Sequence, residues 1–261
     1  MGSILKKPEF VLVPGAWHGP ECFKPTADIL KAKGYKVHGI NLKSVGASPP
    51  LDDFQPDVEI IRNKVDSLLA TSTPVIMVYH SYGGTVGSEA LANYLNTLPT
   101  STNPSCPSSP PGLIRRLFYI ASFCLPKSTS LKTFLGDGPD WYVFSPDHKT
   151  VTCSAPYEIF YNDIEKMEAK KYVDALKEHS LNVFTSPVTA EPWRFIPSTY
   201  VVCEDDKAIP LKAQLGLIKQ AQDIAAGSFD TIERTTSGHS PFISQPEWLA
   251  EKLIKAAETS V

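Results

Sequence analysis

Short apolar runs alternate with amphipathic stretches along most of the chain. Runs typical of β-strands lie at residues 10–13, 37–42, 74–79, 117–121, 200–203 and 231–234. Apolar residues recur at helical spacing between them, at residues 57–70, 85–95, 211–221 and 246–257. This alternation predicts right-handed βαβ units and a mainly parallel, doubly wound α/β sheet of about six strands.

The alternation lapses in residues 123–196. This stretch contains one expected helix, at 163–178, and many aromatic residues. An insertion of this length predicts a helical lid on a core made of 1–122 and 197–261. A second small core filled by the same aromatics is the alternative. Residues 99–112, rich in Ser, Pro and Thr, are expected to form a mobile surface loop.

Composition and charge exclude several classes of function. The 261-residue chain has a formal net charge of −3 and no long basic run, so neither nucleic-acid nor membrane binding is expected. Its five cysteines form no C-x-x-C pair and predict free thiols, which fits a cytoplasmic location. No metal or other cofactor is expected. The expected partner is a small-molecule ester or lactone, and a homodimer is left open.

The segment 75–84 carries the strongest chemical signal. Ser81 stands where a buried apolar run ends and a helix-like stretch begins. A sharp strand–turn–helix elbow holds a serine in a strained conformation, with its hydroxyl above the sheet edge. Gly83 supplies one small residue of this motif, but Tyr79 stands where a second glycine is expected. Ser81 is therefore the predicted nucleophile, on an elbow whose support is altered.

A serine nucleophile needs a base, and the base needs an acid to orient it. His239 lies between the last expected strand and the last expected helix, whereas His80 adjoins the serine and is expected to point away. Asp205 and Asp206 follow the fifth strand. Spacing before the next Ile-Pro pair favours Asp206, with Asp205 as the rival. The resulting order, Ser81, Asp206, His239, is typical of α/β-hydrolases.

The tetrahedral intermediate of such a reaction needs two backbone N–H donors. The amide of Tyr82, directly after the nucleophile, is one candidate. The amide of Ala16 is the other, in a glycine-containing loop after the first strand that also carries His18. The candidate substrate-binding residues are four aromatics, Trp17, Trp141, Tyr161 and Trp193.

Five segments of the sequence carry a family resemblance: residues 10–19, 80–84, 160–163, 203–210 and 238–239. They resemble the plant methylesterase and hydroxynitrile lyase group of α/β-hydrolases and its microbial relatives. The resemblance implies an α/β-hydrolase fold, a helical cap and a buried pocket for a small, often aromatic ester. It also favours Asp206 over Asp205. The lyases carry threonine and lysine where this chain has Gly15 and Ser240, so the resemblance favours hydrolysis over cyanohydrin cleavage.

The sequence thus predicts a serine hydrolase that cleaves a small carboxylic ester through an acyl-enzyme. The same residues could instead hydrolyse a lactone, or cleave or rearrange a C–C bond of a secondary metabolite. A hydroxynitrile-lyase-like activity and a non-catalytic ligand receptor are the remaining alternatives.

Overall fold

The computed structural model describes residues 6–96 and 114–259. The expected loop at 99–112 lies outside these residues, and so does one of the five cysteines. The four described cysteines are free. Six strands form one sheet in the order β2-β1-β3-β4-β8-β9, and every neighbouring pair is parallel. These strands are β1 (Glu9–Val13), β2 (Val37–Gly39), β3 (Val75–His80), β4 (Ile114–Ile120), β8 (Ser198–Cys203) and β9 (Thr231–Thr235).

The burial of each strand follows its place in the sheet. Every residue of β1, β3 and β8 is buried, as expected for interior strands that helices cover on both faces. The edge strands β2 and β9 contain fewer apolar residues and are partly exposed. The predicted mainly parallel sheet of about six strands is confirmed.

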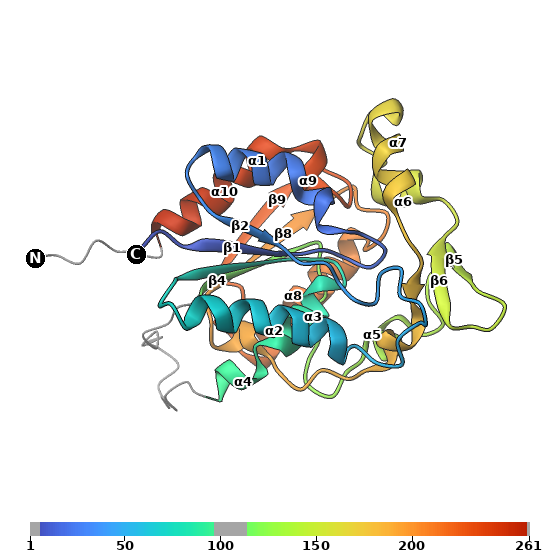
Figure 1. Cartoon of the computed structure of the whole chain (residues 1–261), viewed down its shortest axis with the longest axis horizontal. Helices are drawn as coiled ribbons and strands as arrows, with labels where there is room; N and C mark the ends of the chain where they lie inside the picture. The colour runs from blue at the N-terminus through green and yellow to red at the C-terminus, as the bar shows by residue number, and fades with distance from the viewer. Residues whose placement is uncertain (1–5, 97–113, 260–261) are drawn as a thin grey trace, which may run out of the picture.

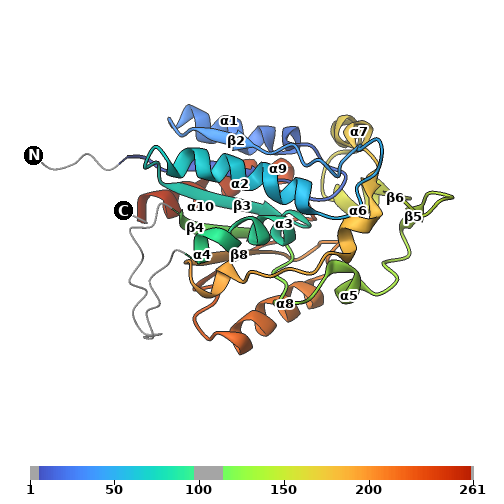
Figure 2. The ribbon, with the colours of Figure 1, turned by 60° about the horizontal axis from the view of Figure 1, so that its bottom comes forward.

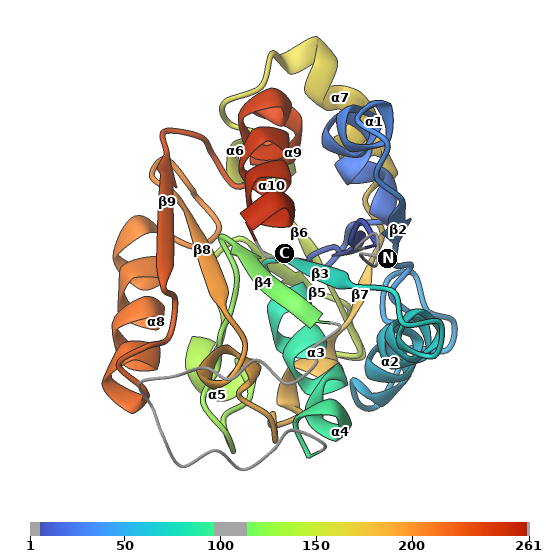
Figure 3. The ribbon, with the colours of Figure 1, turned by 90° about the vertical axis from the view of Figure 1, so that its left-hand side faces the viewer.

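Helices cover both faces of the sheet (Figures 1 and 3). One face carries α1 (Lys24–Ala32), which follows the turn η1 (Pro20–Phe23), together with α9 (Pro241–Ser244) and α10 (Pro246–Thr259). The other face carries α2 (Gln55–Leu69), α3 (Gly83–Ala90), α4 (Ala92–Leu95) and α8 (Leu211–Ile224). The single helix expected at 85–95 is therefore two helices, because the backbone leaves the helical conformation at Leu91.

Most of the inserted segment, residues 123–196, lies beyond the carboxyl ends of the parallel strands, and its last residues return to the start of β8 (Figures 1 and 2). It is not purely helical, which corrects the sequence expectation. A three-stranded antiparallel sheet, β5-β6-β7, stands among its short helices. In chain order the elements are α5 (Leu131–Leu135), β5 (Tyr142–Phe144), β6 (Thr150–Cys153), α6 (Pro156–Phe160), α7 (Lys166–Ala175), β7 (His179–Ser180), η2 (Leu181–Thr185) and η3 (Pro192–Arg194).

The helix expected at 163–178 is the shorter α7. It starts late because the Glu165 side chain caps its first turn by accepting a hydrogen bond from the Glu168 amide. It ends early because the chain turns extended at Leu176 and enters β7.

The order of the strands reverses next to β1, since β2 lies on one side of it and β3 on the other. The loops after β1 and β3 therefore leave the sheet side by side at its carboxyl edge. Ligands of open α/β sheets bind at such a switch point. The predicted nucleophile follows β3 and the predicted amide loop follows β1, so the fold brings both to this edge.

Candidate active site

Ser81 occupies a sharp bend between β3 and α3. Its φ angle is +53°, a left-handed conformation that costs a non-glycine residue free energy. The end of β4 holds this backbone in place. The Ser81 amide donates to the Ile120 carbonyl (3.3 Å), and the Ser81 carbonyl accepts from the Phe123 amide (3.2 Å). The same carbonyl also accepts from the Ser122 hydroxyl at 2.8 Å.

Tyr79, which replaces a glycine of the usual elbow motif, is accommodated by a glycine elsewhere. Its ring is fully buried, and its hydroxyl donates to the Gly87 carbonyl at 3.2 Å. A Cβ atom on Gly87 would lie only 2.3 Å from the tyrosine ring. Gly87 follows Gly83 by about one helical turn, so α3 presents two glycines on one side. Helix α3 thus provides the space that a glycine at position 79 would provide in the usual motif.

His239 and Asp206 form a buried hydrogen-bonded pair. The His239 Nδ1–H donates to Asp206 Oδ2 at 2.8 Å, and both side chains are at most 1% exposed. The other carboxylate oxygen accepts from the amides of Ala208 (2.7 Å) and Ile209 (2.9 Å). Gln214 Nε2 adds a bond to Oδ2 at 3.3 Å. Because Nδ1 carries the proton of a neutral imidazole, the lone pair of Nε2 is left available.

Asp205, the rival acid of the sequence analysis, points elsewhere. Its carboxylate is half exposed, forms an ion pair with Lys207 and accepts a hydrogen bond from Asn162 Nδ2 at 2.7 Å. The structure therefore brings Asp206, and not Asp205, to His239.

His80 joins the His239 loop to the elbow. Its Nε2–H donates to the His239 carbonyl at 3.0 Å, and the two ring centroids are 4.4 Å apart. Burial lowers the pKa of His80 well below its usual value, so the ring is neutral. No hydrogen bond joins the Ser81 hydroxyl to His239 among the described residues; such bonds often tighten only when substrate is bound.

The loop after β1 approaches the elbow closely. A Cβ atom on Gly15 would lie 2.9 Å from Ser81 Cβ, so a glycine is required there. The next residue but one, Trp17, has a φ of +67°, and its indole N–H donates to the Val151 carbonyl of β6 at 2.8 Å. These contacts clamp the loop between the elbow and the inserted segment.

The two predicted amide donors, Ala16 and Tyr82, both line one pocket together with Ser81. Neither N–H donates to an acceptor within the described part of the chain. The backbone directly after the Ala16 N–H is held in place, because the Ala16 carbonyl accepts a hydrogen bond from His18 Nδ1–H at 2.6 Å. The Tyr161 hydroxyl in turn donates to His18 Nε2 at 3.0 Å. Burial lowers the pKa of His18 to about 4, so this histidine is also neutral near pH 7.

Tyr82 is held from the other side by a buried carboxylate that sequence reasoning missed. Its hydroxyl donates to Asp57, in the first turn of α2, at 3.1 Å. Asp57 also accepts from the Ser44 amide at 2.9 Å and from the Ser44 hydroxyl. Burial raises the pKa of Asp57. No local pattern links these three residues, which are distant in sequence.

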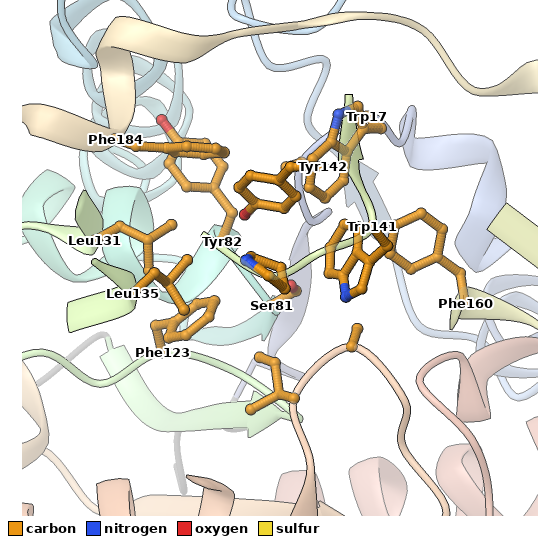
Figure 4. Close-up of a pocket in the computed structure, with 14 residues that line it drawn as sticks. Trp17, Ser81, Tyr82, Phe123, Leu131, Leu135, Trp141, Tyr142, Phe160 and Phe184 are labelled. Carbon is orange, nitrogen blue, oxygen red and sulfur yellow. The ribbon is translucent and has the colours of Figure 1, made fainter. Parts of the chain in front are cut away.

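The pocket above Ser81 is aromatic (Figure 4). Its empty volume, which includes the space open at its mouth, is about 360 Å³. The lining residues are Ala16, Trp17, Ser81, Tyr82, Phe123, Leu131, Leu135, Pro139, Trp141, Tyr142, Phe160, Phe184, Ala208 and Ile209. None of them is charged.

Two of the four predicted substrate-binding aromatics, Trp17 and Trp141, line this pocket. The other two are corrected by the structure. Tyr161 lies behind the wall, where it binds His18, while its neighbour Phe160 faces the pocket. Trp193 is 1% exposed and packs in the hydrophobic core. Sequence alone marks both as aromatic but not which way they point.

Two further properties concern the described residues only. No group of three or more His, Cys, Asp or Glu side chains within residues 6–96 and 114–259 is arranged to hold a metal ion. None of the helices formed by these residues is long and apolar enough to cross a membrane.

Known proteins resemble this chain in sequence and in fold. Residues 10–252 match the model of the alpha/beta hydrolase family. The chain is 29% identical to alpha/beta hydrolase nvfD of Aspergillus novofumigatus, over 98% of each chain. It is 26% identical to norfluorocurarine synthase 2 of Strychnos sp, covering 97% of this chain and 96% of that protein.

The chain is also 24% identical to methylesterase 1 of Arabidopsis thaliana over the whole of both chains. Among solved structures, a pyrethroid hydrolase superposes with a TM-score of 0.75 at 20% identity, covering 96% of this chain and 97% of the other. The predicted likeness to plant methylesterases is thereby confirmed.

Proposed function

The chain belongs to the alpha/beta hydrolase family, and we propose that it hydrolyses a small, uncharged carboxylic ester at Ser81. The observation that carries this proposal is the buried hydrogen bond between His239 and Asp206 at the edge of the sheet where Ser81 is exposed to the pocket. A buried carboxylate that fixes the tautomer of a histidine is the arrangement that a base for a serine nucleophile needs.

In the proposed reaction, Ser81 Oγ attacks the ester carbonyl carbon and its proton passes to His239 Nε2. Asp206 continues to accept the hydrogen bond from Nδ1–H and stabilises the imidazolium that forms. The amides of Ala16 and Tyr82, which have no acceptor within the described residues, bind the oxyanion. His239 then gives the proton to the leaving alkoxide, and the alcohol departs. A water molecule hydrolyses the acyl-enzyme by the same steps in reverse.

We further propose the domain organisation that the sequence predicts. Residues 1–122 and 197–261 form the core, and residues 123–196 act as the lid. Support comes from Trp141, Tyr142 and Phe160, all from the inserted segment, which line the pocket together with core residues. Such a cover excludes water from the reacting atoms and strengthens electrostatic interactions there.

A panel of aryl and methyl esters, assayed with the wild type and Ser81→Ala, tests the proposal. We expect Ser81→Ala to lose the activity that the wild type shows. Ser240→Ala is the matched control, because Ser240 is also buried and adjoins His239 but its hydroxyl has no partner within the described residues. Full activity of Ser81→Ala would overturn the proposal. Tight binding without turnover would indicate a receptor instead.

A second candidate is cleavage or rearrangement of a C–C bond or a lactone on the same residues. The relative named as a synthase and the aromatic cover over Ser81 favour it. Turnover of an ester in ¹⁸O-labelled water separates simple hydrolysis from a C–C rearrangement. Simple hydrolysis places one labelled oxygen in the acid product, whereas a C–C rearrangement leaves the product unlabelled.

A further inference from the structure

Two polar groups in the pocket wall have no partner within the described chain. They are the hydroxyl of Tyr142 and the indole N–H of Trp141, neighbours at the start of β5. Both residues line the pocket, yet no hydrogen bond involves either polar atom, and neither atom is fully buried. Figure 4 shows the Tyr142 hydroxyl directed into the pocket on the side of Ser81 and Tyr82.

The other polar side-chain atoms of the wall are accounted for. The indole N–H of Trp17 donates to the Val151 carbonyl, and the Tyr82 hydroxyl donates to Asp57. Ser81 is the proposed nucleophile. The rest of the lining is aliphatic or aromatic carbon. Tyr142 and Trp141 are therefore the two donors that the pocket offers to a bound molecule beyond the reacting groups.

Ring contacts hold both donors in place. The rings of Trp141 and Tyr142 pack edge to face, with their centroids 4.7 Å apart. Both rings also pack edge to face on Trp17, with centroid distances of 5.6 Å for Trp141 and 5.7 Å for Tyr142. Tyr142 stacks on Phe184 at 6.3 Å. Because their orientation is fixed before a ligand binds, little conformational entropy is lost when they bind one.

The charge state of the wall is also fixed. Burial raises the pKa of Tyr142, so its hydroxyl stays protonated and acts as a donor over the working pH range. An indole N–H only donates. No lining residue carries a charge. An anionic group would be desolvated here without an ion-pair partner, which is costly, whereas an uncharged oxygen acceptor fits.

We infer that the substrate is an uncharged, largely apolar ester with at least one further oxygen acceptor, such as a ketone carbonyl, which accepts a hydrogen bond from Tyr142 or Trp141. The inference rests on the proposed function and names its substrate class. A ligand that lacks the acceptor would cover two donors without satisfying them. A site built in this way discriminates strongly against such a ligand.

Matched esters test this inference. One set consists of phenyl hexanoate and its 4-oxo and 5-oxo analogues; the other consists of hexyl benzoate and its 4-oxo and 5-oxo analogues in the alcohol chain. We expect at least one keto ester to exceed its parent in kcat/KM by about 10-fold or more in the wild type. This ratio should fall toward one in Tyr142→Phe or in Trp141→Phe, in whichever variant has lost the donor that binds the added carbonyl.

Tyr172→Phe is the matched control, because Tyr172 belongs to the inserted segment but does not line the pocket. It should keep the wild-type ratio. Equal turnover of every keto ester and its parent would overturn the inference and leave the proposed function intact. A preference that survives in both Tyr142→Phe and Trp141→Phe would also overturn it. If no ester is turned over and no serine-reactive phosphonate labels Ser81, the proposed function fails as well.

Discussion

The pocket has two walls that are built differently: the core wall, formed by residues of the core, and the wall formed by residues of the inserted segment. Behind the core wall, the side chains that support the reacting groups are fixed by hydrogen bonds, and the Asp206 carboxylate alone accepts four. On the wall from the inserted segment, aromatic rings hold one another edge to face, and the polar atoms of Trp141 and Tyr142 have no partner within the described chain.

This difference separates two tasks. A hydrogen-bonded network tolerates little displacement, as a reaction at Ser81 requires, because proton transfer and oxyanion binding depend on distances of about 3 Å. A wall of rings with free donors fixes no reaction, but it selects by shape and by the acceptors that a ligand offers. Changes in the core wall should therefore affect rate, and changes in the other wall should affect choice of substrate.

The largest effect is expected at the core wall. Asp206→Asn should lower kcat by about 10³-fold or more, because an amide can no longer hold His239 in the tautomer that accepts a proton. Asp205→Asn is the matched control, since the adjacent carboxylate contacts Asn162 and Lys207 instead. Steady-state kinetics of the two variants measure the difference. Equal losses would contradict the assignment of Asp206.

The elbow should be sensitive to volume. Gly87→Ala places a methyl group 2.3 Å from the Tyr79 ring and should lower the free energy of unfolding by about 1–3 kcal/mol. In a Tyr79→Ala background the same change should cost little, because the ring is gone. Urea denaturation of the four proteins completes the double-mutant cycle. Additive effects would show that Gly87 does not accommodate Tyr79.

His179, from the inserted segment, should make the fold acid-sensitive. Burial lowers its pKa to about 3, and both ring nitrogens are buried without a partner in the described chain. Below its ordinary pKa of 6.5 the unfolded chain takes up a proton that the folded chain does not. Stability is therefore lost as pH falls from about 6.5 toward 3, by about 2 kcal/mol at pH 5.

His179→Phe tests this expectation, because it keeps a ring on Phe184 and removes the titration. The variant should lose less stability than the wild type between pH 7 and pH 5 in urea denaturation. His148→Asn, at an exposed histidine, should behave like the wild type. An unchanged pH dependence in His179→Phe would contradict the account.

The smallest effect is expected where the two walls meet, at Tyr82. Asp57→Asn weakens the bond to the Tyr82 hydroxyl and should shift the amide that we assign to the oxyanion. We expect kcat to fall about 10-fold with little change in KM, since the interaction acts on the transition state. Asp53→Asn, an exposed neighbour, should change neither. A rise in KM alone would assign Asp57 to substrate binding.

The core wall was largely predictable from the sequence, because order along the chain and position after a strand place a residue at the carboxyl edge of a parallel sheet. That reasoning points to Ser81, His239 and the pair Asp205 and Asp206, and the spacing before the next Ile-Pro pair and the family resemblance favour Asp206. Hydrogen bonds between distant segments were not predictable, as Asp57 and Tyr82 show. The Tyr79–Gly87 pair left a weak signal, in the two glycines spaced one turn apart on α3.

The wall from the inserted segment was poorly predictable. Aromatic residues were recognised there, but Tyr161 and Trp193 point away from the pocket, and Tyr142 and Phe184 were not among the candidates. Each turn in this segment decides which ring faces inward, and short helices and strands give too few periods to read a face. Only the folded chain shows which rings form the wall.

Reaction with a serine-reactive aryl phosphonate tests the central claim most directly. Intact-mass and peptide mass spectrometry should find one adduct, on Ser81, in the wild type and in Ser240→Ala, and none in Ser81→Ala. The adduct should form far more slowly in His239→Ala, because the base is missing. Stoichiometric modification of a different residue, or equal labelling rates with and without His239, would contradict the account.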